Sequence, residues 1–231
     1  MIQRRRDYVK KDPSRSSNKL YIVSEGIHKE PEYFEFFKGL SSNLEIITIP
    51  PTDGTDPLKL IENARENFFS ENPKYKLDYS QGDKVWFVFD TDSWKTEGKI
   101  IPLQQFCEEQ NKKSFEDILG LRPYRIWNWA QSNPCFEIWL YYHVYETKPN
   151  VMDIEKYGTF KEFVSKSITG GFCLDKHPVF LENAIKNSQK NYLKCDDGMP
   201  YIYSTELHLL GSEILPFVKE ELDKLKNKLR I

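Results

Sequence analysis

The pattern of apolar and polar positions predicts alternating strands and helices over residues 1–146. Short runs rich in Val, Ile and aromatic residues, each bounded by polar or turn-forming residues, predict buried strands at 19–24, 44–49, 84–89 and 124–129. Proline at a helix start and apolar residues at helical spacing predict helices at 31–40, 57–69, 102–110 and 135–145. This alternation favours an α/β fold with a mainly parallel sheet flanked by helices on both faces.

The rest of the chain has a different pattern. Helical spacing predicts helices at 153–167, 178–193 and 205–229, with breaks at Gly170-Gly171 and at 196–198. The last of these segments combines apolar residues at helical spacing with many lysines, which is typical of an amphipathic surface helix. We therefore expect three parts: a basic, partly disordered N-terminal arm at 1–18, an α/β core at 19–146, and a helical C-terminal part at 147–231 that packs on the core.

Composition narrows the possible partners. The chain has 231 residues, 39% of them hydrophobic, and a net charge of −2. A basic coat over the whole surface is therefore excluded, although a local patch is enough for a nucleic-acid enzyme. Residues 1–19 carry seven basic residues against two acidic ones. This arm is either a solvated segment or one that contacts phosphates.

Two further features indicate the compartment. The N-terminus is polar and has no apolar stretch of the kind found in a secretory signal, and no apolar run approaches the ~20 residues of a membrane span. No two of the four cysteines are closer than 22 residues, so no paired metal or redox motif exists. We expect a cytoplasmic protein with reduced thiols that does not associate with membranes.

Acidic residues follow two of the predicted strands. Glu25 comes directly after the first strand, and Asp90 and Asp92 come directly after the third. Because the carboxyl ends of parallel strands meet at one edge of a sheet, we expect these carboxylates to converge there. Carboxylates suit Mg²⁺ or Mn²⁺, and a bound cation would relieve their mutual repulsion. The alternative for Asp90 and Asp92 alone is a turn or a helix cap.

The end of the fourth strand offers further polar residues. Ser132 and Asn133 either cap the following helix or bind a phosphate there. Glu137 lies in the first turn of that helix, where it is either a capping carboxylate or a further acid of the metal site.

Neither the histidines nor any known catalytic or nucleotide-binding motif in the sequence indicates a different chemistry. The default interpretation of His143 is a packed side chain with satisfied hydrogen bonds, and that of His208 is a residue of a first helical turn. There is no HExxH or HxxxH pair for zinc, no GxxxxGK[ST] loop, no GxGxxG after the first strand and no GxSxG. Lys29, Lys95 and Arg125 are cations that could neutralise a phosphate.

Four stretches together resemble the RloB family, whose members are small prokaryotic proteins associated with restriction and phage-defence loci. They are, in order, YIVSEGIHKEPEYFEFF, VWFVFDTDSW, NWAQSNPCFEIWLYYH and YSTELHLL, and the resemblance spans residues 19–212. The Glu-Gly and Asp-x-Asp elements are shared with the wider Toprim superfamily of primases, topoisomerases and OLD-type nucleases. Lys29 departs from the family pattern, which more often has Thr there.

The resemblance implies a Toprim-like core with Mg²⁺- or Mn²⁺-dependent phosphodiester chemistry. Glu25 would be a metal ligand or general acid/base, and Asp90 and Asp92 would hold the metal. The resemblance adds Glu137 to the catalytic set. It also implies substrate-binding roles for a second motif, with Ser132, Asn133 and His143, and for a C-terminal motif expected to fold back over the site, with Ser204, Thr205 and His208. Lys29 is a substrate-binding candidate because it is a nearby cation, not because of the family pattern.

The leading hypothesis from the sequence is a metal-dependent Toprim-type nuclease acting in antiphage defence. Its partners would be a nucleic acid (DNA, RNA or tRNA) and, by resemblance, an ABC- or AAA-type ATPase, and a homodimer is a further expectation. One alternative is a non-catalytic effector or adaptor that binds metal and nucleic acid, or docks on the ATPase, without cutting. Another is primase-like nucleotidyl transfer by the same metal chemistry.

Overall fold

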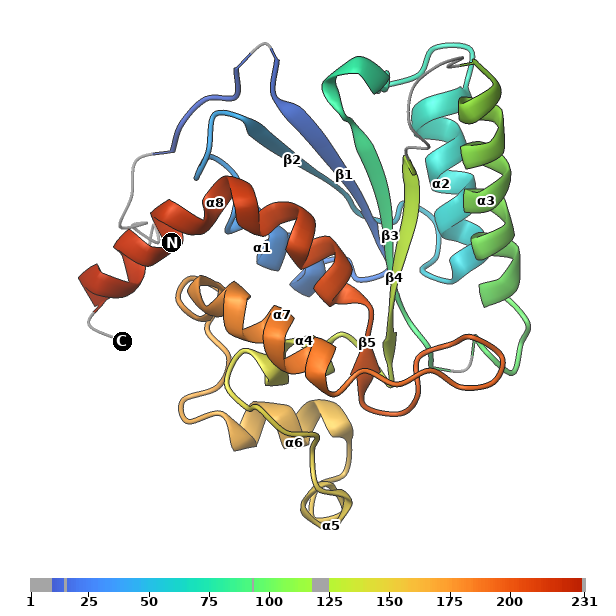
Figure 1. Cartoon of the computed structure of the whole chain (residues 1–231). Coiled ribbons are helices and arrows are strands. Elements are labelled where there is room, and N and C mark those ends of the chain that lie inside the picture. Colours follow the sequence, from blue (N-terminus) through green and yellow to red (C-terminus); the bar gives the residue numbers. More distant parts are fainter. Residues whose placement is uncertain (1–9, 15, 93, 118–124, 230–231) are drawn as a thin grey trace.

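A five-stranded sheet forms the centre of the computed structural model, which describes residues 10–14, 16–92, 94–117 and 125–229 (Figure 1). The strands lie in the order β2-β1-β3-β4-β5; β1 to β4 are parallel and β5 is antiparallel to β4. Their bounds are β1 Asn18–Ser24, β2 Leu44–Ile49, β3 Lys84–Asp90, β4 Trp127–Asn133 and β5 Ser204–Thr205. The prediction of an α/β fold with a mainly parallel sheet is confirmed.

Helices cover both faces of this sheet, as predicted (Figure 1). Two pack on one face, α2 (Pro57–Phe69) and α3 (Ile100–Asp117). Four pack on the other: α1 (Lys29–Glu35), α4 (Glu137–Tyr142), α7 (Leu181–Lys190) and α8 (Leu207–Leu229). Helices α5 (Val151–Ile154) and α6 (Phe160–Ser167) lie beyond α4, and 3-10 turns occupy Tyr79–Gln81 and His177–Phe180.

The period-two alternation of each strand divides the core into two layers. In β1, Leu20 and Ile22 join the cluster under α1 and α8, whereas Tyr21 and Val23 join the cluster under α2 and α3. Successive side chains of a strand point to opposite faces, so a strand that is apolar throughout must be covered on both sides. This is why the continuous apolar runs of β1 and β3 identified buried strands correctly.

The fourth strand lies further along the chain than predicted. It runs from Trp127 to Asn133 rather than over 124–129, and residue 124 itself is outside the described residues. Its second half is polar, and Gln131 and Ser132 are nevertheless buried, because both side chains make hydrogen bonds. The Gln131 amide donates to Thr91 Oγ1 at 2.9 Å, and the hydroxyls of Ser132 and Thr205 lie 2.8 Å apart. An apolar pattern cannot detect a strand whose buried side chains are polar and hydrogen bonded in this way.

The C-terminal elements also differ from the prediction. The helix predicted at 153–167 is two helices. Helix α5 ends at Ile154, and Thr159, whose backbone is extended, starts α6 as its cap by accepting from Glu162 N at 3.1 Å. The helix predicted at 178–193 starts with a 3-10 turn and becomes α-helical only at Leu181. The helix predicted at 205–229 begins at Leu207, and Ser204–Thr205 instead forms β5.

Two further expectations concern the chain's surroundings. Residues 1–9 of the basic arm lie outside the described residues, but Lys11 packs on α8, where its ammonium is 2.9 Å from Glu221 Oε1. Within the described part of the chain, no helix has the length and apolar character needed to cross a bilayer.

Candidate functional site

The ends of β1 and β3 bring Glu25 and Asp90 together. The strands are paired in parallel with Ser24 opposite Val88, so both chains leave the sheet at the same edge. Glu25 Oε2 accepts a hydrogen bond from the Asp90 backbone N–H at 2.9 Å. Its Oε1 accepts from the Trp94 indole N–H, also at 2.9 Å. Glu25 is therefore held over the Asp90 turn, as the positions of the strand ends predicted.

Asp90 is a buried residue whose carboxylate has no hydrogen-bonding partner in the part of the chain that the structure describes. Its residue is only 6% exposed, and neither side-chain oxygen is hydrogen bonded to any described residue. Burial raises the pKa of Asp90 well above its usual value, and the nearby charges of Glu25, Glu30 and Glu137 raise it further. Such an environment favours either a neutral carboxyl or a nearby cation that compensates the charge.

Asp92 has the opposite environment. It is exposed, and its φ of 28° places it in the left-handed region that Asp and Asn tolerate better than most side chains. The Asp-x-Asp turn thus presents one carboxylate to the interior and one to solvent. Burial, together with the nearby charges of Asp92 and Glu30, raises the pKa of Glu25 to about 7, although the hydrogen bonds from Asp90 and Trp94 lower it.

Glu137 is a further acid of the same cluster. It lies in the first turn of α4 and is 5% exposed. Its Oε1 accepts a 2.6 Å hydrogen bond from the Lys29 ammonium, while its buried Oε2 has no partner among the described residues. Burial acts to raise the pKa of Glu137, but the Cys135 thiol and the Lys29 ammonium outweigh it and lower the pKa. The carboxylate is therefore charged, with one oxygen that is not satisfied by the protein.

The sequence analysis missed Glu30, which stands in the first turn of α1. It is 8% exposed, and burial, followed by the charge of Glu137, raises its pKa. Its carboxylate lies against Gly26, where an added Cβ would be 1.7 Å from Glu30 Oε2. The signal available in the sequence was the Glu25-Gly26 pair followed by an acid within one turn of the next helix.

We expect Gly26→Ala to displace the Glu30 carboxylate with little effect on the fold. The methyl group would meet the end of a flexible side chain, not backbone, so the melting temperature should change by no more than about 2–4 °C. Affinity for Mn²⁺, measured by calorimetry, should fall because one acid of the cluster has moved. Gly158→Ala is the matched control, since its Cβ makes only an ordinary 3.5 Å contact. Unchanged Mn²⁺ affinity in Gly26→Ala would remove Glu30 from the site.

The polar residues of the second and C-terminal motifs are built into the sheet beside the cluster. Ser132 is the register partner of Asp90 in β3 and of Thr205 in β5. Asn133 donates to the Pro200 carbonyl at 2.9 Å, and the Ser204 hydroxyl accepts from Leu193 N at 3.1 Å. These motifs therefore form the sheet edge next to the Asp90 turn.

The two histidines of these motifs are buried and held by hydrogen bonds. The His143 Nδ1–H donates to the Trp139 carbonyl at 2.9 Å, so Nε2 accepts from the Tyr33 hydroxyl at 3.0 Å. Burial lowers the pKa of His143 to about 3, which keeps the ring neutral. His208 is also buried, and its Nδ1–H donates to the Thr205 carbonyl at 2.8 Å.

The three cations that the sequence offered as phosphate ligands lie at different places relative to the acid cluster, and a fourth cation lies close to it. Lys29 contacts Glu137, Lys95 pairs with Asp197 at 2.7 Å, and Arg125 precedes the amino end of β4, opposite the cluster. The interpretation of Arg125 as a phosphate ligand of this site was therefore wrong, because residues before a parallel strand lie at the other edge of the sheet.

The fourth cation is Lys161 of α6, which makes no ion pair with a described residue. Partial burial would lower the pKa of Lys161, but the carboxylates of Glu137 and Asp90 raise it above its usual value. Its ammonium is therefore charged and close to the acids.

The carboxylate oxygens of the cluster suit a divalent cation, although the side chains are not arranged as a complete set of ligands. In the part of the chain that the structure describes, no three acidic, histidine or cysteine side chains are arranged as ligands of one ion. Metal binding therefore requires some side-chain rearrangement. The unpaired carboxylate of Asp90 and the orphaned Oε2 of Glu137 are hard oxygen donors in a buried, negatively charged position, which is the chemistry that Mg²⁺ and Mn²⁺ prefer.

Comparison with known proteins gave one match. A family model described as RloB-like protein matches residues 20–214, which include every acid of the cluster. Searches of curated proteins and of solved structures returned no significant match.

Proposed function

This chain belongs to the RloB-like family, and from that premise we propose that it is a metal-dependent nuclease of the Toprim type that acts in antiphage defence. Family membership fits a defence-associated role. The Toprim-like assignment is supported by a parallel sheet in which one glutamate follows β1 and two aspartates lie at the end of the neighbouring strand β3.

The observation that carries the proposal is the Asp90 carboxylate, whose residue is 6% exposed and which is not hydrogen bonded to any described residue, inside a cluster of acids. Leaving a charged group buried without a partner costs several kcal/mol, and proteins retain such groups mainly at functional sites. The charges of Glu25, Glu30 and Glu137 raise its pKa further, and the Lys161 ammonium offsets this only in part. A cluster that is unfavourable by itself becomes favourable once a divalent cation binds.

The proposed reaction is hydrolysis of a phosphodiester: water attacks phosphorus, one P–O bond breaks, and the departing oxygen takes up a proton. Asp90 and Asp92 would hold Mg²⁺ or Mn²⁺, which when bound neutralises phosphate charge and makes a bound water more acidic. Glu25 either completes the ligand set or accepts the proton of the attacking water. Lys29 and Lys161 attract the phosphates of the substrate to the edge of the sheet.

The direct test is cleavage of labelled DNA and RNA by purified protein with Mg²⁺ or Mn²⁺, with and without its partner ATPase. We expect metal-dependent cleavage of at least one substrate, and a loss of at least about 100-fold in Asp90→Asn and Glu25→Gln. Arg125→Gln is the control, because Arg125 lies at the opposite edge of the sheet. The nuclease proposal fails if no substrate is cut even with the ATPase present.

The second candidate is a non-catalytic effector that binds metal and nucleic acid or docks on a defence ATPase. The observation in its favour is that the acids are not arranged as ligands of one ion in the described residues. It predicts metal and nucleic-acid binding without cleavage, so the same assay separates the two. Incorporation of labelled nucleotides in that assay would instead reveal primase-like synthesis.

A further inference from the structure

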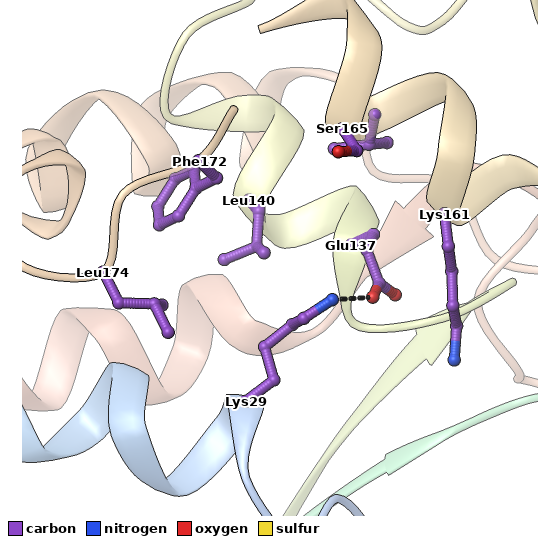
Figure 2. Close-up of a pocket in the computed structure, with 8 residues that line it drawn as sticks. Lys29, Glu137, Leu140, Lys161, Ser165, Phe172 and Leu174 are labelled. Carbon is purple, nitrogen blue, oxygen red and sulfur yellow. Dashed lines mark hydrogen bonds and ion pairs between the residues drawn. The ribbon is translucent and has the colours of Figure 1, made fainter. Parts of the chain in front are cut away.

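A small pocket opens directly beside the acid cluster. It has a volume of ≈ 110 Å³ and is formed by side chains of α1, α4 and α6 and of the segment before α7. Glu137 is part of its wall, so the pocket is continuous with the proposed metal site. Figure 2 shows Lys29 and Lys161 on two sides of the Glu137 carboxylate.

The two ends of this pocket differ in chemistry. Lys29 and Lys161 form a cationic end next to Glu137, whereas Leu140, Phe172 and Leu174 form an apolar end (Figure 2). The Phe172 ring is only partly buried, although it packs on the rings of His143 and His177 with centroids 5.1 and 4.9 Å away. A rigidly packed aromatic ring at the wall of an apolar pocket is a platform on which a planar group can stack.

Phosphate and an adjacent flat apolar ring are the two components of a nucleotide. We propose that this pocket receives one unstacked base of a single-stranded nucleic acid, with the neighbouring phosphate at the ammonium of Lys161, which makes no ion pair with a described residue. The inference rests on the proposed function and names its substrate class. A base in a duplex is paired and stacked and cannot enter a side pocket without being extruded, which costs a few kcal/mol. The enzyme should therefore prefer single strands, loops or ends to duplex.

The test compares binding of fluorescein-labelled DNA and RNA oligonucleotides, single-stranded or annealed, by fluorescence anisotropy in EDTA. Stacking of one base on an aromatic side chain is worth about fivefold to 100-fold in affinity. We expect the wild type to bind the single strand at least about fivefold more tightly than the duplex.

Two variants address the pocket itself. Ser165→Trp fills it from an exposed position on its rim, and Phe172→Leu keeps apolar bulk but removes the stacking ring. Both should remove the preference for single strands while leaving duplex binding unchanged. Thr169→Trp adds the same side chain at an exposed position outside the pocket and should behave as wild type. Lys161→Ala should weaken binding to both forms, because it removes a phosphate contact.

The outcomes separate this inference from the proposed function. Equal affinity for single strand and duplex, or an unchanged preference in both Ser165→Trp and Phe172→Leu, overturns the base pocket. These binding measurements need neither metal nor cleavage. A preference for single strands in a protein that cuts no substrate would leave the pocket assignment intact and overturn only the nuclease proposal.

Discussion

Replacing Asp90 by asparagine is expected to raise the melting temperature of the metal-free protein at pH 8 while reducing its affinity for Mn²⁺. The change keeps the shape of the side chain and removes a buried charge that lies near three other acids. Removing a buried charge that Lys161 compensates only in part should stabilise the fold by at least about 1 kcal/mol, or about 2–4 °C in a domain of this size. A residue that is retained at a cost in stability is retained for function.

The same substitution has a pH dependence with a definite sign. The pKa of Asp90 is raised in the folded state, so its contribution to stability is fully present below the unfolded pKa of 3.8 and is lost as the pH rises. The pKa of Glu25, raised to about 7, acts in the same direction above pH 4.5. The advantage of Asp90→Asn should therefore be larger at pH 8 than at pH 5.

Differential scanning calorimetry at the two pH values, with and without Mn²⁺, measures both effects. Mn²⁺ should raise the melting temperature of the wild type and have little effect on Asp90→Asn. Asp92→Asn is the matched control: Asp92 is exposed and asparagine tolerates its positive φ, so stability should stay within about 0.5 kcal/mol. A lower melting temperature for Asp90→Asn at pH 8 would mean that the carboxylate stabilises the fold.

His143→Phe is expected to destabilise the protein by about 1–3 kcal/mol at pH 7, because it leaves the buried Tyr33 hydroxyl without its acceptor. In the wild type, burial lowers the His143 pKa from 6.5 to about 3. The histidine thus contributes stability above pH 6.5 that is lost as the pH falls towards 3, by up to about 1.4 kcal/mol per pH unit. The variant lacks this pH dependence, so the difference in unfolding free energy between wild type and variant should become smaller as the pH falls.

Urea denaturation between pH 7 and pH 4 measures this difference. The double variant Tyr33→Phe, His143→Phe is the control, because removing both partners restores a matched apolar pair and should recover part of the lost stability. If His143→Phe leaves stability unchanged at pH 7 but weakens nucleic-acid binding, the histidine contacts substrate, as the family motif suggested, and is not a packed core residue.

The sequence predicted the framework of the site because that framework depends on short-range patterns. The apolar runs of β1 and β3 predicted two buried strands, and Glu25 and Asp90 lie at their carboxyl ends. Parallel pairing then requires these residues to meet at one edge. The environment of each acid could not be predicted from the sequence, since nothing in the Asp-x-Asp pattern indicated that Asp90 is buried and Asp92 exposed.

Features that depend on contacts between distant segments could not be read from the sequence. Lys161 approaches the acids only because α6 packs beyond α4, and no local motif marks it. The polar half of β4 is a strand because β5, some 70 residues later, supplies Thr205 as a partner. Arg125 was assigned to the site on its residue type alone, and its place before β4 excludes it.

The central claim is that Glu25, Asp90 and Asp92 hold a divalent cation. The most direct test is a crystal structure of the protein with Mn²⁺, in which anomalous scattering locates the ion. The account predicts one anomalous peak between the Glu25 carboxylate and the Asp90–Asp92 turn, absent in Asp90→Asn. An ion bound elsewhere, or no ion at this edge of the sheet at saturating Mn²⁺, would contradict it.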